Sequence, residues 1–157
     1  MSHRRVWRLF VVSVFAITIQ APLAAQSEED AVRDVLVTYA ARMQAGDLEG
    51  MGALVAPERG VHIIEGAGVN HGWADYRDHH LGPELERAEN FEMRYFAVEP
   101  QVRGDIAWTS FRYELAAEMS GNKMELEGRG TAVLERREGR WLIVHLHTSG
   151  RRKRSDG

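Results

Sequence analysis

Two histidines separated by one residue, His145 and His147, lie near the C-terminal end of the chain. Side chains at positions i and i+2 of a strand point to the same face, so both imidazoles could reach one bound molecule. Imidazole titrates near neutral pH, which suits it to general acid or base catalysis. Neutral imidazole is also a ligand for zinc or copper, with His80 as a candidate third ligand and Glu84 as a possible fourth. The pair therefore allows catalysis, metal binding or simple orientation of an organic ligand.

The elements that would position these histidines are strands. Alternating apolar and polar residues predict four strands, at about 91–102, 106–119, 124–136 and 141–149. Short turn segments separate them, so each neighbouring pair should form an antiparallel hairpin. If Glu138 and Gly139 form the last turn, His145 lies opposite Ala132 and His147 opposite Gly130. That register places both histidines on the apolar, inner face of the sheet.

The other two hairpins are expected to present aromatic residues on the same face. A three-residue turn at 103–105 pairs Tyr95 with Tyr113, and a two-residue turn at 121–122 places Phe111 opposite Ala132. Glycines beside bulky aromatic residues suggest a bend and a cavity above the sheet. We therefore expect a pocket between sheet and helices with these residues in its wall: Tyr95, Phe111, Tyr113, His145 and His147.

Helices precede the strands. Apolar residues from Val32 to Met43 recur with a helical period, and Ser27 with Asp30 resembles a capping box at the start of this helix. Asp47 should cap a second, short helix. Residues 61–65 predict a short strand and residues 66–70 a turn.

A third helix is expected over about 72–81, with Trp73, Tyr76 and His80 on one face above the pocket. Gly82 and Pro83 should break or restart this helix, because proline lacks a backbone N–H and disfavours helix in the residue before it.

The ends of the chain differ from its body. Residues 1–25 read as an export signal: arginines, an apolar run over 9–19, then small residues. The mature protein should start near Gln26 and be periplasmic or secreted. The apolar run is shorter than the roughly 20 residues that span a bilayer, so no stable membrane anchor is expected after cleavage. Residues 151–157 are expected to form a basic, disordered tail.

Composition excludes several function classes. The 157-residue chain contains no cysteine, which excludes disulfides, thiolate metal sites and cysteine nucleophiles. Residues 26–150 contain 13 basic and 22 acidic residues, which argues against a nucleic-acid surface. One domain, over 26–150, accounts for the predicted helices and strands.

Three segments together are similar to one known superfamily: the closing strand from Gly139 to Ser149, the preceding run from Gly128 to Val133, and His80 to Leu85. Over about residues 27–150 the chain resembles the nuclear transport factor 2-like superfamily, in its polyketide-cyclase (SnoaL)-like and calcium/calmodulin-dependent kinase association-domain-like branches. The resemblance implies an α+β fold, a cone-shaped curved antiparallel sheet wrapped on N-terminal helices. It leaves function open, because the superfamily includes isomerases, dehydratases, cyclases and non-catalytic binders.

We interpret the chain as an exported domain that binds a small organic ligand. No Asp or Glu is expected on the inner face near the histidines, which favours binding over catalysis. The alternative is an isomerase, dehydratase or cyclase in which His145 or His147 is the general acid or base and Tyr95 or Tyr113 supports an oxyanion. The second alternative is a zinc or copper site of His80, His145 and His147; otherwise no cofactor is expected. The predicted ligand-binding residues are Trp73, Tyr76, His80, Tyr95, Phe111, Tyr113, His145 and His147.

The outer face of the sheet is expected to form a homodimer interface. The predicted register places Leu142, Val144 and Leu146 beside Val133 on this face, with Trp108 nearby. An exposed apolar patch of this kind is typical of an interface.

Overall fold

The computed structural model describes residues 21–58 and 60–153. The predicted export signal lies largely outside these residues, so its cleavage stays a prediction. The helices are α1 (Ala21–Gln44), α2 (Leu48–Gly52), α3 (Trp73–Tyr76), the π-helical turn η1 (Arg77–Leu81) and α4 (Gly82–Arg87). The strands are β1 (His62–Glu65), β2 (Gly68–His71), β3 (Ala88–Arg103), β4 (Ile106–Met119), β5 (Asn122–Arg137) and β6 (Arg140–Arg152).

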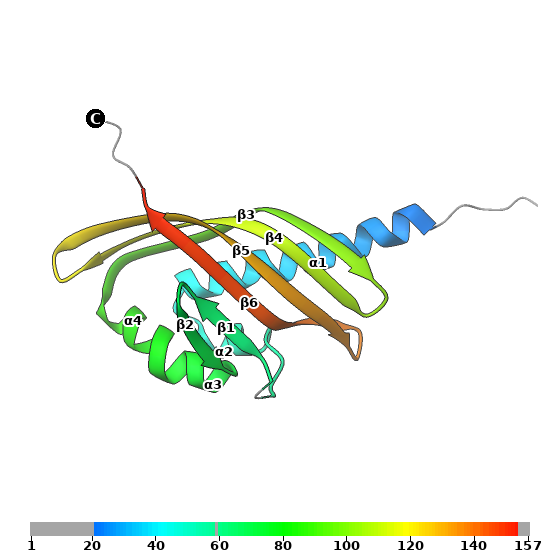
Figure 1. Cartoon of the computed structure of the whole chain (residues 1–157), viewed down its shortest axis with the longest axis horizontal. Helices are drawn as coiled ribbons and strands as arrows, with labels where there is room; N and C mark the ends of the chain where they lie inside the picture. Colours follow the sequence, from blue (N-terminus) through cyan, green and yellow to red (C-terminus); the bar gives the residue numbers. More distant parts are fainter. Residues whose placement is uncertain (1–20, 59, 154–157) are drawn as a thin grey trace, which may run out of the picture.

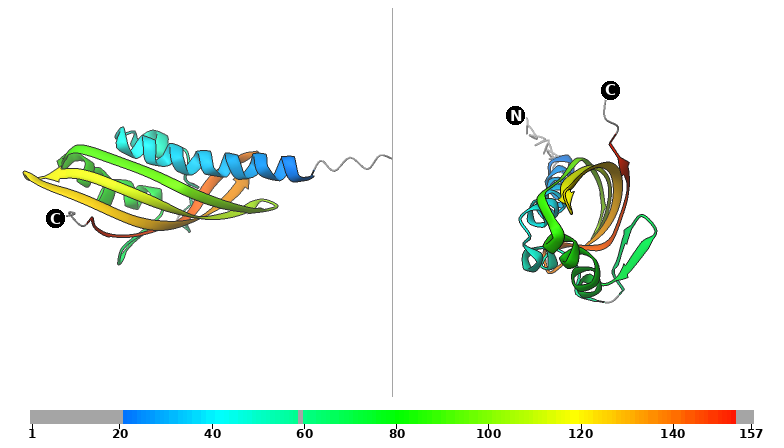
Figure 2. Two further views of the ribbon diagram at one scale, coloured as in Figure 1. Left: turned by 90° about the horizontal axis from the view of Figure 1, so that it is seen from above. Right: turned by 90° about the vertical axis from the view of Figure 1, so that its left-hand side faces the viewer.

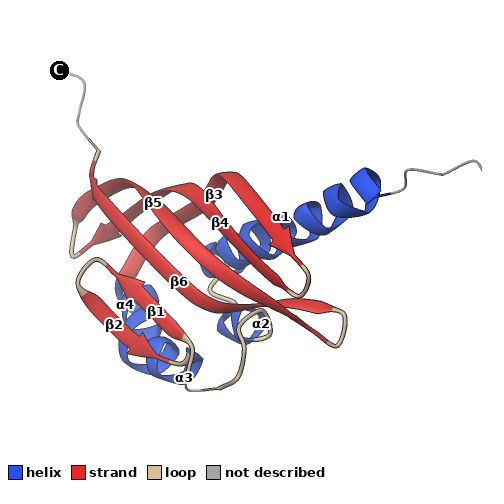
Figure 3. Ribbon diagram, turned by 45° about the vertical axis from the view of Figure 1, so that its right-hand side comes forward, coloured by secondary structure: helices blue, strands red, loops and turns tan. Residues whose placement is uncertain are grey.

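The strands form one curved sheet in the order β2-β1-β6-β5-β4-β3. Neighbouring strands are antiparallel except for β1 and β6, which are parallel. The helices lie on the concave side of the sheet (Figures 1 and 2), and α1 packs along β3. Figure 3 shows the short β1–β2 hairpin at one edge, next to the segment that contains α3 and α4. The predicted α+β architecture is confirmed, and β2 replaces part of the predicted turn.

Helix α1 buries the stripe that its periodicity predicts. Val32, Leu36, Tyr39 and Met43 are all buried against the sheet. The helix begins at Ala21, earlier than the predicted capping box at Ser27. Asp47 caps α2 as predicted, because its carboxylate accepts a hydrogen bond from the backbone N–H of Gly50.

The third predicted helix restarts at Gly82 and Pro83, the second of the two outcomes that the sequence predicts there. A π-helical turn over Arg77–Leu81 leads directly into α4, whose second residue is Pro83. Proline suits the first turn of a helix because its missing N–H has no intrahelical partner there. The π-helical turn therefore lets His80 and Glu84 lie on one continuous helical segment, and π turns of this kind are frequent at functional sites.

The last hairpin contains a β-bulge that changes the predicted register. The turn at Glu138–Gly139 is correct, and Leu134 pairs with Ile143 as predicted. Beyond it the register shifts by one residue: Val133 pairs with His145, so Val144 is the extra residue of β6. A shift of one residue moves every later side chain to the opposite face. The prediction that the last-strand histidines face inward is therefore wrong.

On the C-terminal side of the bulge, the inward positions of β6 are Leu146 and Thr148, which are both buried. They pair with Ala132 and Gly130, the residues predicted to face the histidines. The predicted dimer patch changes for the same reason, since Leu146 belongs to the core and not to the outer face.

The other two hairpins keep their predicted faces. Tyr95 pairs with Tyr113 as predicted, although the turn has two residues and a bulge near Ala97 restores the register. In β4 and β5 the pairing shifts by two residues, so Phe111 pairs with Gly130 instead of Ala132. A shift of two residues leaves each side chain on the same face.

The inward glycines of β5 make room for aromatic rings. A Cβ atom at Gly130 would overlap the ring of Phe111, and one at Gly128 would overlap Tyr113. The space above these glycines, predicted to be a cavity, is therefore filled by the two rings.

The basic C-terminal segment is partly ordered. Arg151 and Arg152 end strand β6, paired with Glu127 and Leu126, and the Lys153 N–H donates to the Glu125 carbonyl. The interpretation of residues 151–157 as a disordered tail is wrong for these three residues. Within the described ranges, no helix is both long and apolar enough to cross a membrane.

Candidate functional site

Six of the eight predicted ligand-binding residues come together in one aromatic cluster. Tyr39 of α1, missed by the sequence analysis as a site residue, lies at its centre, 6.4 Å from both the Trp73 and the Tyr95 ring. The ring centroids of Trp73 and Tyr76 are 5.9 Å apart. On the sheet, Tyr95 stacks on Phe111 at 4.3 Å. The other members are Tyr113, 6.3 Å from Tyr95, and His80, 5.3 Å from Tyr76.

A carboxylate lies at the edge of this cluster. Glu65, the last residue of β1, accepts a hydrogen bond from the Tyr76 hydroxyl through Oε1 at 2.7 Å. Its other oxygen, Oε2, is 3.1 Å from His80 Nε2. The side chain of Glu65 is 29% exposed and that of His80 is 25% exposed. Both groups are therefore anchored in the interior and still accessible to a small molecule.

The His80 imidazole is held at both nitrogens. Nδ1 is 3.0 Å from Asn70 Oδ1, and Nε2 lies 3.4 Å from Glu84 Oε1 in addition to its contact with Glu65. The hydrogen bond to Glu65 raises the pKa of His80, an effect that partial burial opposes. Burial raises the pKa of Glu84, and the neighbouring Glu65 charge adds to that shift while His80 opposes it. The three groups form a proton-carrying unit with two carboxylates around one imidazole.

The tyrosine hydroxyls of the cluster are neutral donors. Burial raises the pKa of Tyr39, Tyr76 and Tyr95, and the Glu65 charge contributes in each case. The Tyr39 hydroxyl is fully buried and has no hydrogen-bond partner among the described residues. A buried hydroxyl without a partner is unfavourable by about 1–3 kcal/mol.

The predicted strand histidines lie elsewhere. His145 and His147 are on the outer face, with His62 as the cross-strand partner of His145. Burial lowers the pKa of His145, and the neighbouring His147 and His62 add to the effect. The structure therefore does not bring His80 to the two strand histidines, and the predicted metal set is not assembled.

A different set has the spacing of metal ligands. Glu65, His80 and Glu84 each offer one ligand atom, and these atoms lie within 4.8 Å of one another. No other group of three His, Asp or Glu residues in the described part of the chain has this spacing. Two carboxylates and one imidazole can bind a metal ion or act as general acids and bases. The hydrogen bond from the Tyr76 hydroxyl orients Glu65 in both cases.

The sequence contains a signal for the missed carboxylate. Val61, Ile63 and Glu65 alternate with His62, so a strand that buries Val61 and Ile63 turns Glu65 inward as well. Tyr39 lies on the apolar stripe of α1, which predicts its burial but not the position of its hydroxyl. The parallel pairing of β1 with β6, which places Glu65 beside Thr148, has no local sequence signal.

Comparison with known proteins identifies one family and one fold. A family model described as the SnoaL-like domain matches residues 32–151. A nuclear transport factor 2-like superfamily protein from Salmonella enterica serovar Typhimurium is 20% identical, with a TM-score of 0.70, and the match covers 87% of this chain and 97% of that chain. Among curated proteins, none matches.

Two further solved structures with a similar fold are named as candidate enzymes. A candidate ketosteroid isomerase from Shewanella frigidimarina is 25% identical with a TM-score of 0.64, over 74% of this chain and 92% of that chain. A candidate scytalone dehydratase from Novosphingobium aromaticivorans is 12% identical with a TM-score of 0.71, over 84% of this chain and 89% of that chain.

Proposed function

Because this chain belongs to the SnoaL-like domain family of the nuclear transport factor 2-like superfamily, we propose that it is an acid–base enzyme of the isomerase or dehydratase type. Its substrate is a small, largely apolar organic molecule that enters beside Glu65 and His80. The observation that carries the proposal is the Glu65 carboxylate, held between the Tyr76 hydroxyl and the His80 imidazole while remaining partly exposed.

The presence of Glu65 changes the balance between binding and catalysis. The sequence favours binding alone, because it predicts no carboxylate on the inner face near a histidine. Glu65 is such a carboxylate, and His80 takes the acid–base role assigned from sequence to the strand histidines. The candidate isomerase and dehydratase among the similar structures support the same reaction class.

Each group has a role that its surroundings favour. Glu65 removes a proton from a carbon next to a carbonyl, and the carbonyl oxygen becomes negative. The Tyr39 hydroxyl, buried and unpaired, donates a hydrogen bond to that oxygen. His80, whose pKa is raised, donates a proton from Nε2. In an isomerisation the His80 proton goes to another carbon of the substrate; in a dehydration the C–O bond breaks and the leaving hydroxide takes the His80 proton to become water. The proton on Glu65 then returns to His80 Nε2 across their 3.1 Å contact, which restores both groups.

Hydrogen–deuterium exchange tests this step without knowledge of the natural substrate. Wild-type protein in D2O should accelerate loss of the α-proton signal of cyclic ketones or β-hydroxy ketones, measured by proton NMR. Glu65→Gln should reduce the rate at least 100-fold, and Tyr39→Phe about 100-fold, because one removes the base and the other a single oxyanion donor. An unchanged rate in Glu65→Gln would contradict the proposal, and binding of a ketone without exchange would favour the binding-module alternative.

His79→Gln is the matched control for His80→Gln. His79 is the neighbouring histidine in the same π-helical turn, but its side chain is 76% exposed and contacts Asp75 instead of the site. Only the His80 variant should lower the exchange rate.

We also retain two proposals from the sequence, export and dimerisation. For the dimer, the outer apolar patch is now defined by Ile106, Trp108 and Val133; Ile106 is 41% and Trp108 44% exposed, whereas Leu142 is 8% exposed and belongs to the core. Sedimentation should give a dimer that Trp108→Glu dissociates, and a wild-type monomer at micromolar concentration would contradict it. N-terminal sequencing of exported material should begin near Gln26.

A further inference from the structure

The outer face of the sheet carries two arginines in direct opposition. Arg112 of β4 and Arg129 of β5 are cross-strand partners, and both are exposed. Arg112 also pairs with Phe96 of β3, and Arg129 pairs with Ser149 of β6. Like charges directly opposite each other destabilise a sheet, so this pairing needs a compensating group.

The neighbouring carboxylates are already engaged. Glu114 accepts from Arg94 at 2.5 Å and lies 3.9 Å from Lys153. Glu127 accepts from Arg151 at 2.8 Å.

In the part of the chain that the structure describes, neither Arg112 nor Arg129 forms a hydrogen bond or an ion pair. Arg112 instead stacks on the Phe96 ring, with its guanidinium carbon 5.2 Å from the ring centroid. Neither guanidinium group therefore has an ion-pair partner of its own: Arg94 is the main cause of the lowered pKa of Glu114, and the charge of Arg112 only adds to it. Arg112 is held in place by an aromatic ring.

Two surface pockets share this pair. One has a volume of about 460 Å³ and is lined by Arg112, Arg129 and Ser149. Its wall also contains Ser110, Thr131 and His147. The other, of about 530 Å³, continues from the same three residues toward Glu127 and Arg151. Glu99 lines the first pocket and is its single carboxylate. A volume of this size accommodates a small ligand, and the shared wall supplies guanidinium and hydroxyl donors.

We propose that Arg112 and Arg129 bind a phosphate-type oxyanion, either free phosphate or the phosphate group of a small ligand. An arginine presents a planar fork of N–H donors that matches such an anion, and two opposed forks can hold it from both sides. The Ser149 hydroxyl and His147 extend the donor set on β6. The site lies on the opposite face of the sheet from Glu65 and His80, so it is independent of the proposed catalytic function.

Calorimetry and thermal unfolding with inorganic phosphate and with phenyl phosphate test the proposal, at constant ionic strength adjusted with sodium chloride. Wild-type protein should bind phosphate saturably and gain Tm with concentration. Arg112→Gln and Arg129→Gln should each weaken binding at least 10-fold. In phosphate-free buffer, Arg129→Gln should unfold at the same Tm as wild type or higher, because it relieves the opposed charges.

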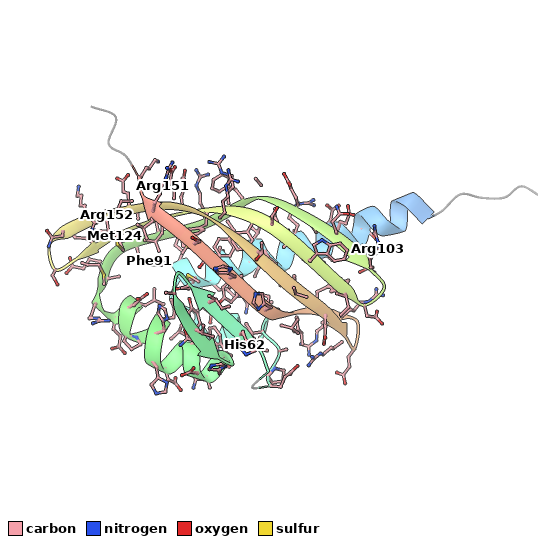
Figure 4. All side chains as sticks on the ribbon, in the orientation of Figure 1. His62, Phe91, Arg103, Met124, Arg151 and Arg152 are labelled. Carbon is pink, nitrogen blue, oxygen red and sulfur yellow. The ribbon has the colours of Figure 1, made fainter. Side chains whose placement is uncertain are left out.

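Arg103→Gln is the matched control. Arg103 is another exposed outer-face arginine stacked on an aromatic ring, 5.9 Å from the Trp108 centroid, and it lines neither pocket. Figure 4 shows it at the opposite end of the sheet from Arg151. This variant should bind phosphate as wild type does.

The absence of saturable binding by wild type, or an equal loss in Arg103→Gln, would overturn the proposal. Tighter binding of phenyl phosphate than of inorganic phosphate, by 10-fold or more, would assign the site to a phosphorylated organic ligand. Equal affinities would assign it to free phosphate.

Discussion

The two faces of one sheet use the same strands for opposite purposes. On the inner face, glycines of β5 allow the rings of Phe111 and Tyr113 to lie against the backbone, and Tyr95 stacks on Phe111. On the outer face the intervening positions carry charges in cross-strand rows, including the opposed Arg112 and Arg129. Alternation along a strand makes the two faces neighbours in sequence. Substitutions at the inner positions should therefore change stability. Substitutions at the outer positions should instead change the binding of anions that we propose for this face.

Truncation of a ring on each face should give the largest difference between them. Phe111 is 2% exposed, and Phe111→Ala should lower the free energy of unfolding by about 3–5 kcal/mol, because it leaves a cavity beneath Tyr95. Trp108 is larger but lies on the outer face and is 44% exposed in the single chain, so in dilute, monomeric protein Trp108→Ala should cost much less, about 1 kcal/mol or below. Urea titration of both variants measures the difference, and equal losses would contradict the assignment of faces.

Adding a methyl group beneath the same ring should have an intermediate effect. Gly130→Ala places a Cβ atom where the Phe111 ring lies, and we expect a loss of about 1–3 kcal/mol from the displaced ring. Gly60→Ala is the control, because a Cβ atom there meets no heavy atom within 4 Å. Thermal unfolding should separate the two variants by several degrees, and a neutral Gly130→Ala would show that the ring has room to move.

The sequence predicted the strands and the inner aromatic residues because alternation and turn residues are local signals. The bounds of β4 are as predicted, and Tyr95, Phe111 and Tyr113 face inward although two hairpins differ in their turns. The histidines were misplaced because the bulge at Val144 has no distinctive residue, and a single extra residue exchanges the faces.

The candidate site could be predicted only in part. His80, Trp73 and Tyr76 share a helical face, which periodicity alone indicates. Glu65 depends on a parallel pairing between β1 and β6, segments separated by some eighty residues in the chain, and no local pattern specifies that contact.

Removal of the Tyr39 hydroxyl should have a smaller effect of opposite sign. The hydroxyl is buried without a partner among the described residues, so Tyr39→Phe should stabilise the ligand-free protein by about 1 kcal/mol. Tyr76→Phe is the matched control and should be destabilising, because the Tyr76 hydroxyl donates to Glu65. Chemical denaturation measures both variants, and a destabilised Tyr39→Phe would indicate that the hydroxyl is satisfied in the folded state.

The smallest expected effect is a difference in titration between a histidine of the inner cluster and one of the outer face. The pKa of His80 is raised, chiefly by its hydrogen bond to Glu65, so its stabilising contribution is complete below about pH 6.5 and is lost as pH rises through the folded-state pKa. The pKa of His145 is lowered, chiefly by burial, so its contribution is present above about pH 6.5 and is lost as pH falls through the folded-state pKa.

NMR titration of the ring signals should therefore place the His80 midpoint above that of His145. Glu65→Gln should lower the His80 midpoint and leave that of His145 unchanged, whereas coincident midpoints in the wild type would show that the two environments do not differ. His147→Ala should raise the His145 midpoint but leave it below the ordinary histidine value, because burial still lowers the pKa of His145 after the neighbouring charge is removed.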